Sequence, residues 1–168
     1  MNFLNKGTSK VLTKLAFKPI FKMMIRTYTK ADKKELIEIL RLNTPQYFDE
    51  TEEQDFINYL DKEVEDYFVL EENGKIIGCG GVNYFPESNS ARISWDMIHP
   101  DFHGKGLGKI LTLHRISHLR KTPNLKQIIV RTTQLTYKFY QKMGFELEKT
   151  EKDYWAKGFD LYQMKIDV

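Results

Sequence analysis

The chain has 168 residues, of which 41% are hydrophobic and 13% aromatic, so it can bury one sizeable core but hardly two. Its single cysteine, Cys79, excludes an intrachain disulfide framework. No apolar run approaches the roughly 20 residues that a membrane span needs. We therefore expect one cytoplasmic domain, with no membrane partner and with Cys79 as a small buried residue.

The positive charge is concentrated at the start of the chain. The charged side chains of residues 1–24 are lysines at every fourth position, namely Lys6, Lys10, Lys14, Lys18 and Lys22. Without these five lysines the basic residues fall from 26 to 21, against 23 acidic ones, so nucleic acid is not expected as a partner. We interpret residues 1–23 as a separate basic extension. A disordered extension is favoured over a packed accessory helix or a membrane-surface or partner-binding helix.

The hydrophobic spacing alternates between helical and strand periods over residues 24–168, which we predict to be one domain. In chain order we expect a strand over 25–28, helices over 30–42 and from residue 51, strands over 67–71, 75–84 and 92–99, a helix over 107–120, a strand over 127–131, a short helix over 137–143, and strands over 146–154 and 160–166. This order indicates a mixed α+β domain.

Two local signals support elements in the first half. Thr51 followed by Gln54 predicts a capping box at the start of the second helix. The pair Asn73 and Gly74 is the favoured two-residue hairpin turn, so the strands on either side of it are predicted to be antiparallel.

The third helix is marked by residues at i, i+3, i+4 and i+7, which are Leu107, Ile110, Leu111 and His114. His114 and His118 also share one helix face. A metalloprotease helix needs Glu directly after the first His, and Arg115 occupies that place. No metal site is therefore expected.

A glycine-rich loop, HGKGLG at residues 103–108, lies between a predicted strand and this helix. Glycines allow successive backbone N–H groups to point at phosphate oxygens, and the following helix N-terminus adds a positive dipole end. Lys105 and Lys109 add full positive charges. The loop is therefore a candidate pyrophosphate cradle, the alternative being a turn that uses its glycines only for geometry.

Two other phosphate-binding loops are excluded by what the sequence lacks. A P-loop needs Ser or Thr after Lys109 and a glycine five residues before Gly108, where this chain has Ile110 and His103. A dinucleotide-binding fingerprint needs G-x-G-x-x-G and an acidic residue about twenty positions later. The loop reads G-x-G-x-G, and that acidic residue is missing.

The chain from residue 25 to its end resembles the GNAT superfamily of acyl-CoA-dependent N-acetyltransferases. The family's cofactor motif is a strand ending in V-x-P followed by Q/R-x-x-G-x-G/A and a helix. Here the strand ends in Ile98, His99 and Pro100, and the loop is residues 103–108. His103 stands where the family usually has Gln or Arg.

A second motif near the C-terminus strengthens this resemblance. The family pattern N-x-x-A-x-x-x-Y-x-x-x-G-F is matched in its second half by residues 140–145, YQKMGF. Thr133 and Thr136 replace the Asn and Ala of the first half. The two motifs occur in the family's order, with a predicted strand between them.

The resemblance implies an α+β (mixed α/β) GNAT-like fold, with a central, mostly antiparallel twisted sheet of six to seven strands flanked by about four helices. It also implies an enzyme that transfers the acetyl group of acetyl-CoA directly to a primary amine of a small molecule or peptide, without a metal. The alternative is a non-catalytic acyl-CoA-binding or protein-interaction module with the same fold. The identity of the acceptor and a homodimer are left open.

The resemblance further implies which residues carry the site. The expected cofactor-binding residues follow the two motifs, and they are Met97, Ile98, His99, His103, Gly104, Lys105, Gly106, Leu107, Gly108, Lys109, Thr133, Tyr137, Tyr140 and Lys142. The Ile98 N–H is the expected oxyanion-side donor, and Tyr140 is the expected general acid for the departing thiolate. The acceptor site is expected between residues 43–55 and 154–159.

The general base is assigned from strand alternation. A regular strand places Arg92, Ser94, Asp96 and Ile98 on one face and Ile93, Trp95 and Met97 on the other. Asp96 is therefore the carboxylate nearest the expected thioester and the candidate base. A salt-bridged or solvated Asp96 is the alternative, and His99 and His103 are other titratable candidates.

Overall fold

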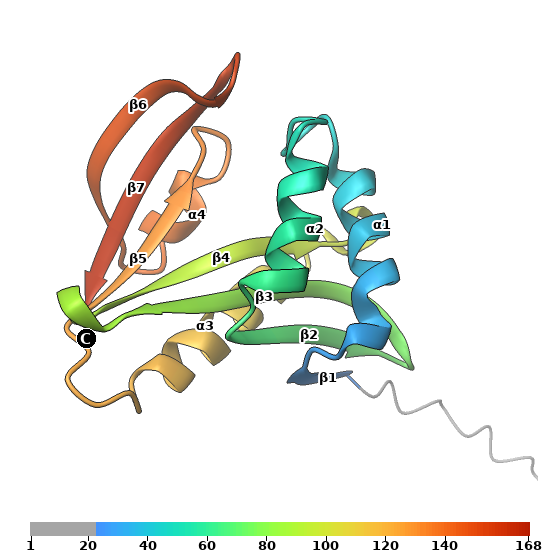
Figure 1. Cartoon of the computed structure of the whole chain (residues 1–168). Coiled ribbons are helices and arrows are strands. Elements are labelled where there is room, and N and C mark those ends of the chain that lie inside the picture. Colours follow the sequence, from blue (N-terminus) through green and yellow to red (C-terminus); the bar gives the residue numbers. More distant parts are fainter. Residues whose placement is uncertain (1–22) are drawn as a thin grey trace, which may run out of the picture.

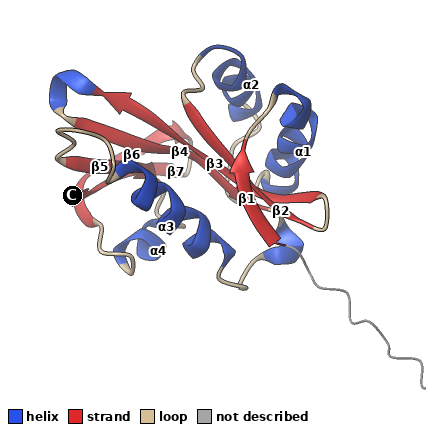
Figure 2. Cartoon of the chain, turned by 90° about the horizontal axis from the view of Figure 1, so that it is seen from below, coloured by secondary structure: helices blue, strands red, loops and turns tan. Residues whose placement is uncertain are grey.

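The structure is a computed structural model that describes residues 23–168. The predictions made for residues 1–22 lie outside these described residues. Seven strands form one sheet in the order β1-β2-β3-β4-β5-β7-β6 (Figures 1 and 2). Neighbouring strands are antiparallel except for β4 and β5, which are parallel. The predicted mixed, mostly antiparallel sheet is confirmed.

The helices and strands follow the predicted order. Their bounds are β1 Met23–Thr27, α1 Lys33–Asn43, α2 Glu52–Lys62, β2 Asp66–Glu72, β3 Lys75–Phe85, β4 Ser90–Ile98, α3 Leu107–Leu119, β5 Gln127–Thr132, α4 Tyr137–Gln141, β6 Glu146–Ala156 and β7 Phe159–Asp167. The hairpin between β2 and β3 turns at Asn73 and Gly74, which both have positive φ. That pair is therefore the predicted two-residue turn.

Helices cover both faces of the sheet. Figures 1 and 2 show α1 and α2 on one face and α3 and α4 on the other. The α1/α2 side is packed around Leu36, Phe56 and Tyr67, and the α3/α4 side around Leu111, Ile116 and Phe145. Cys79 is fully buried in the α1/α2 cluster, as predicted.

Strand β4 does not alternate regularly, which corrects the predicted faces. Its register with β3 shifts between Ser94 and Met97, and Trp95 has a φ of +50°. This β-bulge puts two residues of β4 opposite one residue of β3 and exchanges the faces of the side chains that follow. Ile93 therefore packs on the α3 side, whereas Met97 packs on the α1/α2 side. Asp96 reaches the α3 side because of the same bulge.

Two of the four residues whose spacing marked α3, Leu107 and Leu111, are buried. Ile110 is 40% exposed and His114 is exposed. The buried residues of the helix are Leu107, Leu111, Thr112, Arg115, Ile116 and Leu119. The predicted helix is confirmed, and its buried side includes the charged Arg115, which the spacing of apolar residues does not indicate.

The capping box predicted for α2 is not present. Thr51 is the N-cap residue, but its side chain makes no capping hydrogen bond to the helix. Its hydroxyl instead donates to the Asp49 carboxylate, and the Gln54 amide donates to Asn58. Asp49 thus competes for the hydroxyl on which the predicted box depends.

Candidate active site

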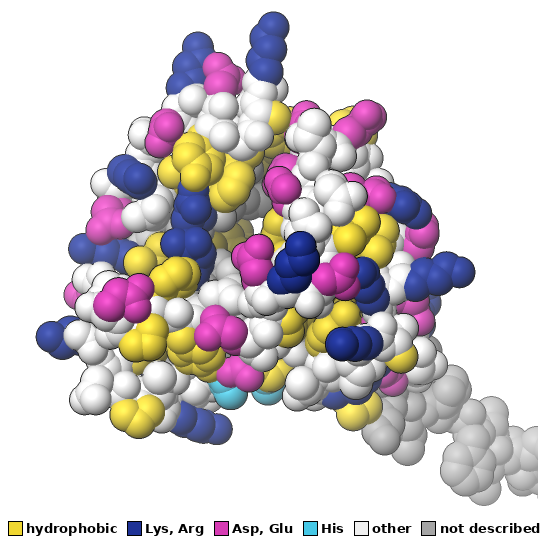
Figure 3. Space-filling view, in the orientation of Figure 1, with side chains coloured by type: hydrophobic (Ala, Val, Ile, Leu, Met, Phe, Trp, Pro, Cys, Tyr) yellow, Lys and Arg dark blue, Asp and Glu magenta, His cyan; other side chains and the backbone are white. Residues whose placement is uncertain are grey.

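The separation of β4 from β5 opens the site. The two parallel strands pair only from Ser90 to Ile93, so the second half of β4 has no β5 partner (Figure 1). A cavity of about 630 Å³ lies there, lined by β4, β5, α3, α4 and the segment from α1 to α2. Figure 3 shows the molecule hollowed between the β5–β7 arm and helices α1 and α2.

The backbone of Ile98 points toward this opening. The His99 N–H bonds to the Ile77 carbonyl of β3, at 2.8 Å. Consecutive residues of a strand direct their amides to opposite edges, so the Ile98 N–H and C=O point away from β3. The Ile98 carbonyl accepts hydrogen bonds from the Asn43 amide, at 3.1 Å, and from His103 Nε2, at 2.8 Å. These bonds fix the end of β4 to α1 and to the glycine loop.

The glycine loop lines the same cavity. Gly104 and Gly106 have φ values of +73° and +78°, a region that side chains with a Cβ rarely adopt. The first internal bond of α3 runs from the Ile110 N–H to the Gly106 carbonyl. The N–H groups that precede Ile110 in the first turn therefore have no acceptor within the helix, as is general at helix N-termini. They are suited to anionic oxygens.

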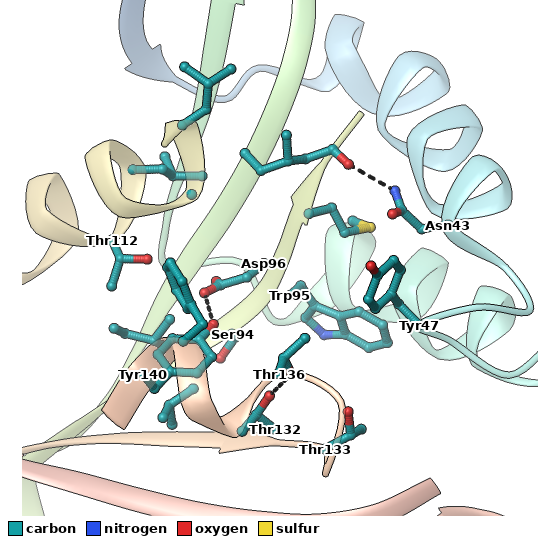
Figure 4. Close-up of a pocket in the computed structure, with 18 of the residues that line it drawn as sticks. Asn43, Tyr47, Ser94, Trp95, Asp96, Thr112, Thr132, Thr133, Thr136 and Tyr140 are labelled. Atoms are coloured by element: carbon teal, nitrogen blue, oxygen red, sulfur yellow. Dashed lines mark hydrogen bonds between the residues drawn. The ribbon is translucent and has the colours of Figure 1, made fainter. Parts of the chain in front are cut away.

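An ion pair and a phenol lie deeper in the cavity. Both oxygens of the Asp96 carboxylate accept from the guanidinium of Arg115, whose side chain is 0% exposed. The Tyr140 hydroxyl donates to the same carboxylate, as Figure 4 shows. The buried guanidinium also donates to the Gly81 carbonyl and the Thr112 hydroxyl. Asp96 thus links the helix α3 to the predicted general acid.

A glycine in β3 makes room for this pair. A Cβ built on Gly80 would lie 2.6 Å from Arg115 Nη1 and 2.9 Å from Asp96 Oδ1. Those distances are shorter than nonbonded carbon contacts allow. The ion pair therefore depends on the missing side chain at position 80.

Burial and charge change the pKa of both partners of Asp96. Burial raises the pKa of Tyr140 well above its ordinary value, and the charge of Asp96 raises it further, against the opposing effect of Arg115. Burial alone lowers the pKa of Arg115, but the charge and hydrogen bonds of Asp96 outweigh it and the net shift is upward. At neutral pH the phenol is therefore protonated and the guanidinium charged.

Ten of the predicted cofactor-binding residues line the cavity, namely Met97, Ile98, His103, Gly104, Gly106, Leu107, Gly108, Lys109, Thr133 and Tyr140. The other four do not. His99 Nδ1 accepts from the Asp101 amide, and Lys105 Nζ lies 4.5 Å from the centre of the Phe102 ring. Tyr137 stacks on Tyr162, and Lys142 is exposed. Cofactor contacts of these four stay predictions.

Two charged cavity residues, Arg92 and Arg131, were not assigned to the site from the sequence. Arg92, Arg131 and Glu52 line it together with the predicted residues. The Glu52 carboxylate accepts from the Asp49 amide, and burial raises the pKa of Glu52. The two regions expected to hold the acceptor also line the cavity, residues 43–55 through Glu52 and others and residues 154–159 through Trp155 of β6.

A family model described as the acetyltransferase (GNAT) family matches residues 33–145, which is more than half of the chain. The chain belongs to the GNAT acetyltransferase family. The resemblance stated from the two motifs is thus confirmed. Among the residues that the structure describes, no helix is long and apolar enough to cross a bilayer, and no cluster of His, Cys, Asp and Glu is arranged to hold a metal ion.

Individual GNAT proteins resemble this chain in part. An amino-acid acetyltransferase of Vibrio atlanticus is 32% identical over 109 residues, which is 65% of this chain but 24% of that protein. The chain thus spans about a quarter of the length of this curated relative. Among solved structures, the ribosomal-protein-S18-alanine N-acetyltransferase of Escherichia coli superposes with a TM-score of 0.73 at 18% identity, covering 88% of this chain and 94% of that one.

A further solved structure was determined with cofactor and product. N-acetylglutamate synthase from Neisseria gonorrhoeae, complexed with coenzyme A and N-acetyl-glutamate, superposes with a TM-score of 0.68 at 17% identity. The match covers 88% of this chain and 35% of that one. At such identities these two likenesses establish the shared fold of the three chains.

Proposed function

We propose that the protein transfers the acetyl group of acetyl-CoA to a primary amine by direct attack. The observation that carries this proposal is one cavity that joins the open N-terminal turn of α3 to Ile98 and Tyr140. The diphosphate of the cofactor would bind the amides of the glycine loop, and its acyl arm would lie between the separated strands β4 and β5. The thioester then lies near the Ile98 N–H.

The reaction follows from these positions. The neutral amine attacks the thioester carbonyl carbon, and the N–H of Ile98 stabilises the oxyanion that forms. The C–S bond then breaks, and the Tyr140 hydroxyl, which is protonated at neutral pH, turns its proton from the Asp96 carboxylate to the CoA sulfur. The nitrogen gives up one proton to solvent, and the Tyr140 phenolate takes one back from solvent. Amide and free thiol are the products.

The geometry supports a role for Asp96 in positioning the side chain of Tyr140. Its carboxylate already accepts from Arg115 and from Tyr140, so it holds the phenol in the cavity and has little capacity left for an incoming ammonium. The role of Asp96 as general base stays a prediction. Glu52 offers a second carboxylate in the same cavity, and its raised pKa suits a proton acceptor.

The test is a transfer assay with wild type, Tyr140→Phe and Tyr28→Phe. We expect wild type to release CoA with a primary amine present and Tyr140→Phe to lower kcat about 100-fold or more, with an unchanged calorimetric Kd for acetyl-CoA. Tyr28→Phe is the matched control, because Tyr28 packs against the α1/α2 cluster outside the cavity lining.

Two outcomes contradict the proposal at different points. Failure of wild type to bind acetyl-CoA removes the cofactor assignment. Binding without transfer to any amine of a broad panel favours the alternative, a module that holds the acyl-CoA without turnover. An unchanged kcat in Tyr140→Phe would leave the transferase intact and reject the acid role.

A further inference from the structure

Two arginines stand on either side of the point where β4 and β5 separate. The last paired residues of these strands are Ile93 and Val130. Arg92 directly precedes this pair on β4, Arg131 directly follows it on β5, and both line the main cavity. The two guanidinium groups are therefore brought together by the topology of the sheet, although 38 residues separate them in sequence.

Aromatic rings support both guanidinium groups. Arg92 Cζ lies 4.6 Å from the centre of the Phe85 ring. Arg131 Cζ lies 4.7 Å from the Tyr154 ring centre and 5.0 Å from that of Trp155. Stacking of this kind holds the planar guanidinium in place and leaves its edge, with the N–H donors, for another partner. Figure 3 shows basic and hydrophobic side chains together on the β5–β7 side of the hollow.

Within residues 23–168, neither arginine forms a salt bridge. The Nε atoms of both are buried and have no hydrogen-bond partner there. Glu65 shares a neighbouring cavity of about 280 Å³ with Arg92, but its carboxylate accepts from the Asn83 side chain and the Tyr84 amide. The described residues thus supply no acceptor for these donors, although buried donors are nearly always satisfied in folded proteins. An anion could still bind the other N–H groups of the two guanidiniums.

The two like charges are also held near each other. Burial lowers the pKa of Arg92, and the positive charge of Arg131 lowers it further. Arg92 still stays protonated at neutral pH, because an arginine does not lose its proton there. An anion placed between them would relieve their repulsion and supply the missing acceptors.

The cofactor's own phosphates are expected at the opposite end of β4. Arg92 lies where the open part of β4 begins, beside the last residues that pair with β5, and it lines the same cavity as Tyr140. The glycine loop that would hold the diphosphate lies beyond Ile98. The arginine pair is thus placed to bind the other substrate, which is the amine acceptor.

We propose that Arg92 and Arg131 together bind a carboxylate of the acceptor, so that the preferred substrates are amino acids or other amines that carry a carboxylate. A guanidinium offers two parallel N–H donors that match the two oxygens of a carboxylate. This inference rests on the proposed acetyl transfer and specifies its acceptor class.

The experiment compares amines that differ only in charge. The panel contains the twenty L-amino acids, β-alanine, 4-aminobutyrate and 5-aminovalerate, each beside its carboxamide, with 2-aminoethylphosphonate and phosphoethanolamine added. For the best acceptor we expect kcat/KM of the acid to exceed that of the amide about tenfold or more. Arg92→Gln and Arg131→Gln should remove most of this preference through a higher acceptor KM, with the Kd of acetyl-CoA unchanged.

Matched variants keep the experiment decisive. Arg120→Gln removes an exposed arginine at the end of α3 and should leave the preference intact. Arg131→Lys keeps the charge without the planar fork, so it should recover part of the preference and also serves if Arg131→Gln folds poorly.

The outcomes separate the inference from the transferase itself. Equal rates for acids and amides, or faster transfer to the phosphorus-containing amines, overturn the carboxylate site while acetyl transfer stands. Loss of acetyl-CoA binding in wild type, with no transfer to any member of the panel, overturns both.

Discussion

Two arginines that lie on opposite faces of β4, Arg115 of α3 and Arg92 of β4 itself, differ in whether their charge is paired within the protein. On the α3 side, Arg115 is fully buried, and its guanidinium donates to Asp96, Gly81 and Thr112 within the protein, with Asp96 as its counter-charge. On the α1/α2 side, Arg92 is half-buried, rests on an aromatic ring and has no carboxylate partner within the described part of the chain. A charge that is neutralised internally organises the protein, whereas a charge left without a partner can recognise a ligand.

The largest expected effect comes from breaking the satisfied arginine. Arg115→Leu leaves the Asp96 carboxylate without its counter-charge against a buried helix, and breaking such a pair costs about 3–5 kcal/mol. We expect the free energy of unfolding in urea to fall by that amount. Arg92→Leu should cost much less, because no ion pair is lost.

A double variant checks the cause of that loss. Asp96→Asn combined with Arg115→Leu removes both charges and should recover part of the stability lost in Arg115→Leu alone. If the double variant is as unstable as the sum of the two single ones, the loss arises from packing and the contrast between the two arginines is weaker than stated.

The next effect separates backbone strain from ligand binding. Gly106→Ala and Gly74→Ala each place a Cβ at a positive φ in open space, so each should lower stability by about 1–2 kcal/mol. Only Gly106 belongs to the cavity. We therefore expect calorimetry to show weaker acetyl-CoA binding for Gly106→Ala and an unchanged Kd for Gly74→Ala. Equal Kd values for the two variants would remove the loop from cofactor binding.

The smallest expected effect concerns the pH dependence of kcat, which should show no contribution from Tyr140 ionisation. Burial and Asp96 raise the pKa of Tyr140 above the ordinary value of 10.0, so the proton that the phenol donates is retained up to that pH. The Tyr140 contribution to stability is likewise complete below pH 10 and is lost only as pH rises through the higher folded pKa. We expect no fall in kcat from Tyr140 ionisation between about pH 8 and 10. A basic limb in that interval, abolished in Tyr140→Phe, contradicts this assignment.

The helices and strands were predicted because their signals are local, whereas the sheet that they form was implied by the resemblance to the GNAT family. Hydrophobic periods, the Asn73–Gly74 turn and the two motifs each act within a short segment, and the strands and the cavity-lining loop were found where these signals placed them. The bulge at Trp95 escaped prediction because nothing in a run of alternating residues marks where the register with a neighbouring strand shifts.

The buried charge was missed for a related reason. Arg115 occupies a four-residue stripe with Leu107, Leu111 and Leu119, and a charged residue within such a stripe is a signal of a buried ion pair that apolar spacing alone disregards. Its partner Asp96 lies on a distant strand, so the pairing depends on tertiary structure. The opposed pair Arg92 and Arg131 likewise becomes visible only once β4 and β5 are neighbours.

The missing side chain at Gly80 affects residues outside β3. A methyl group there would collide with the guanidinium of Arg115, and the displaced guanidinium would pull the Asp96 carboxylate away from the phenol it holds. An alanine at position 80 should thus disturb the orientation of Tyr140, the proposed general acid, although residue 80 lies outside the cavity lining.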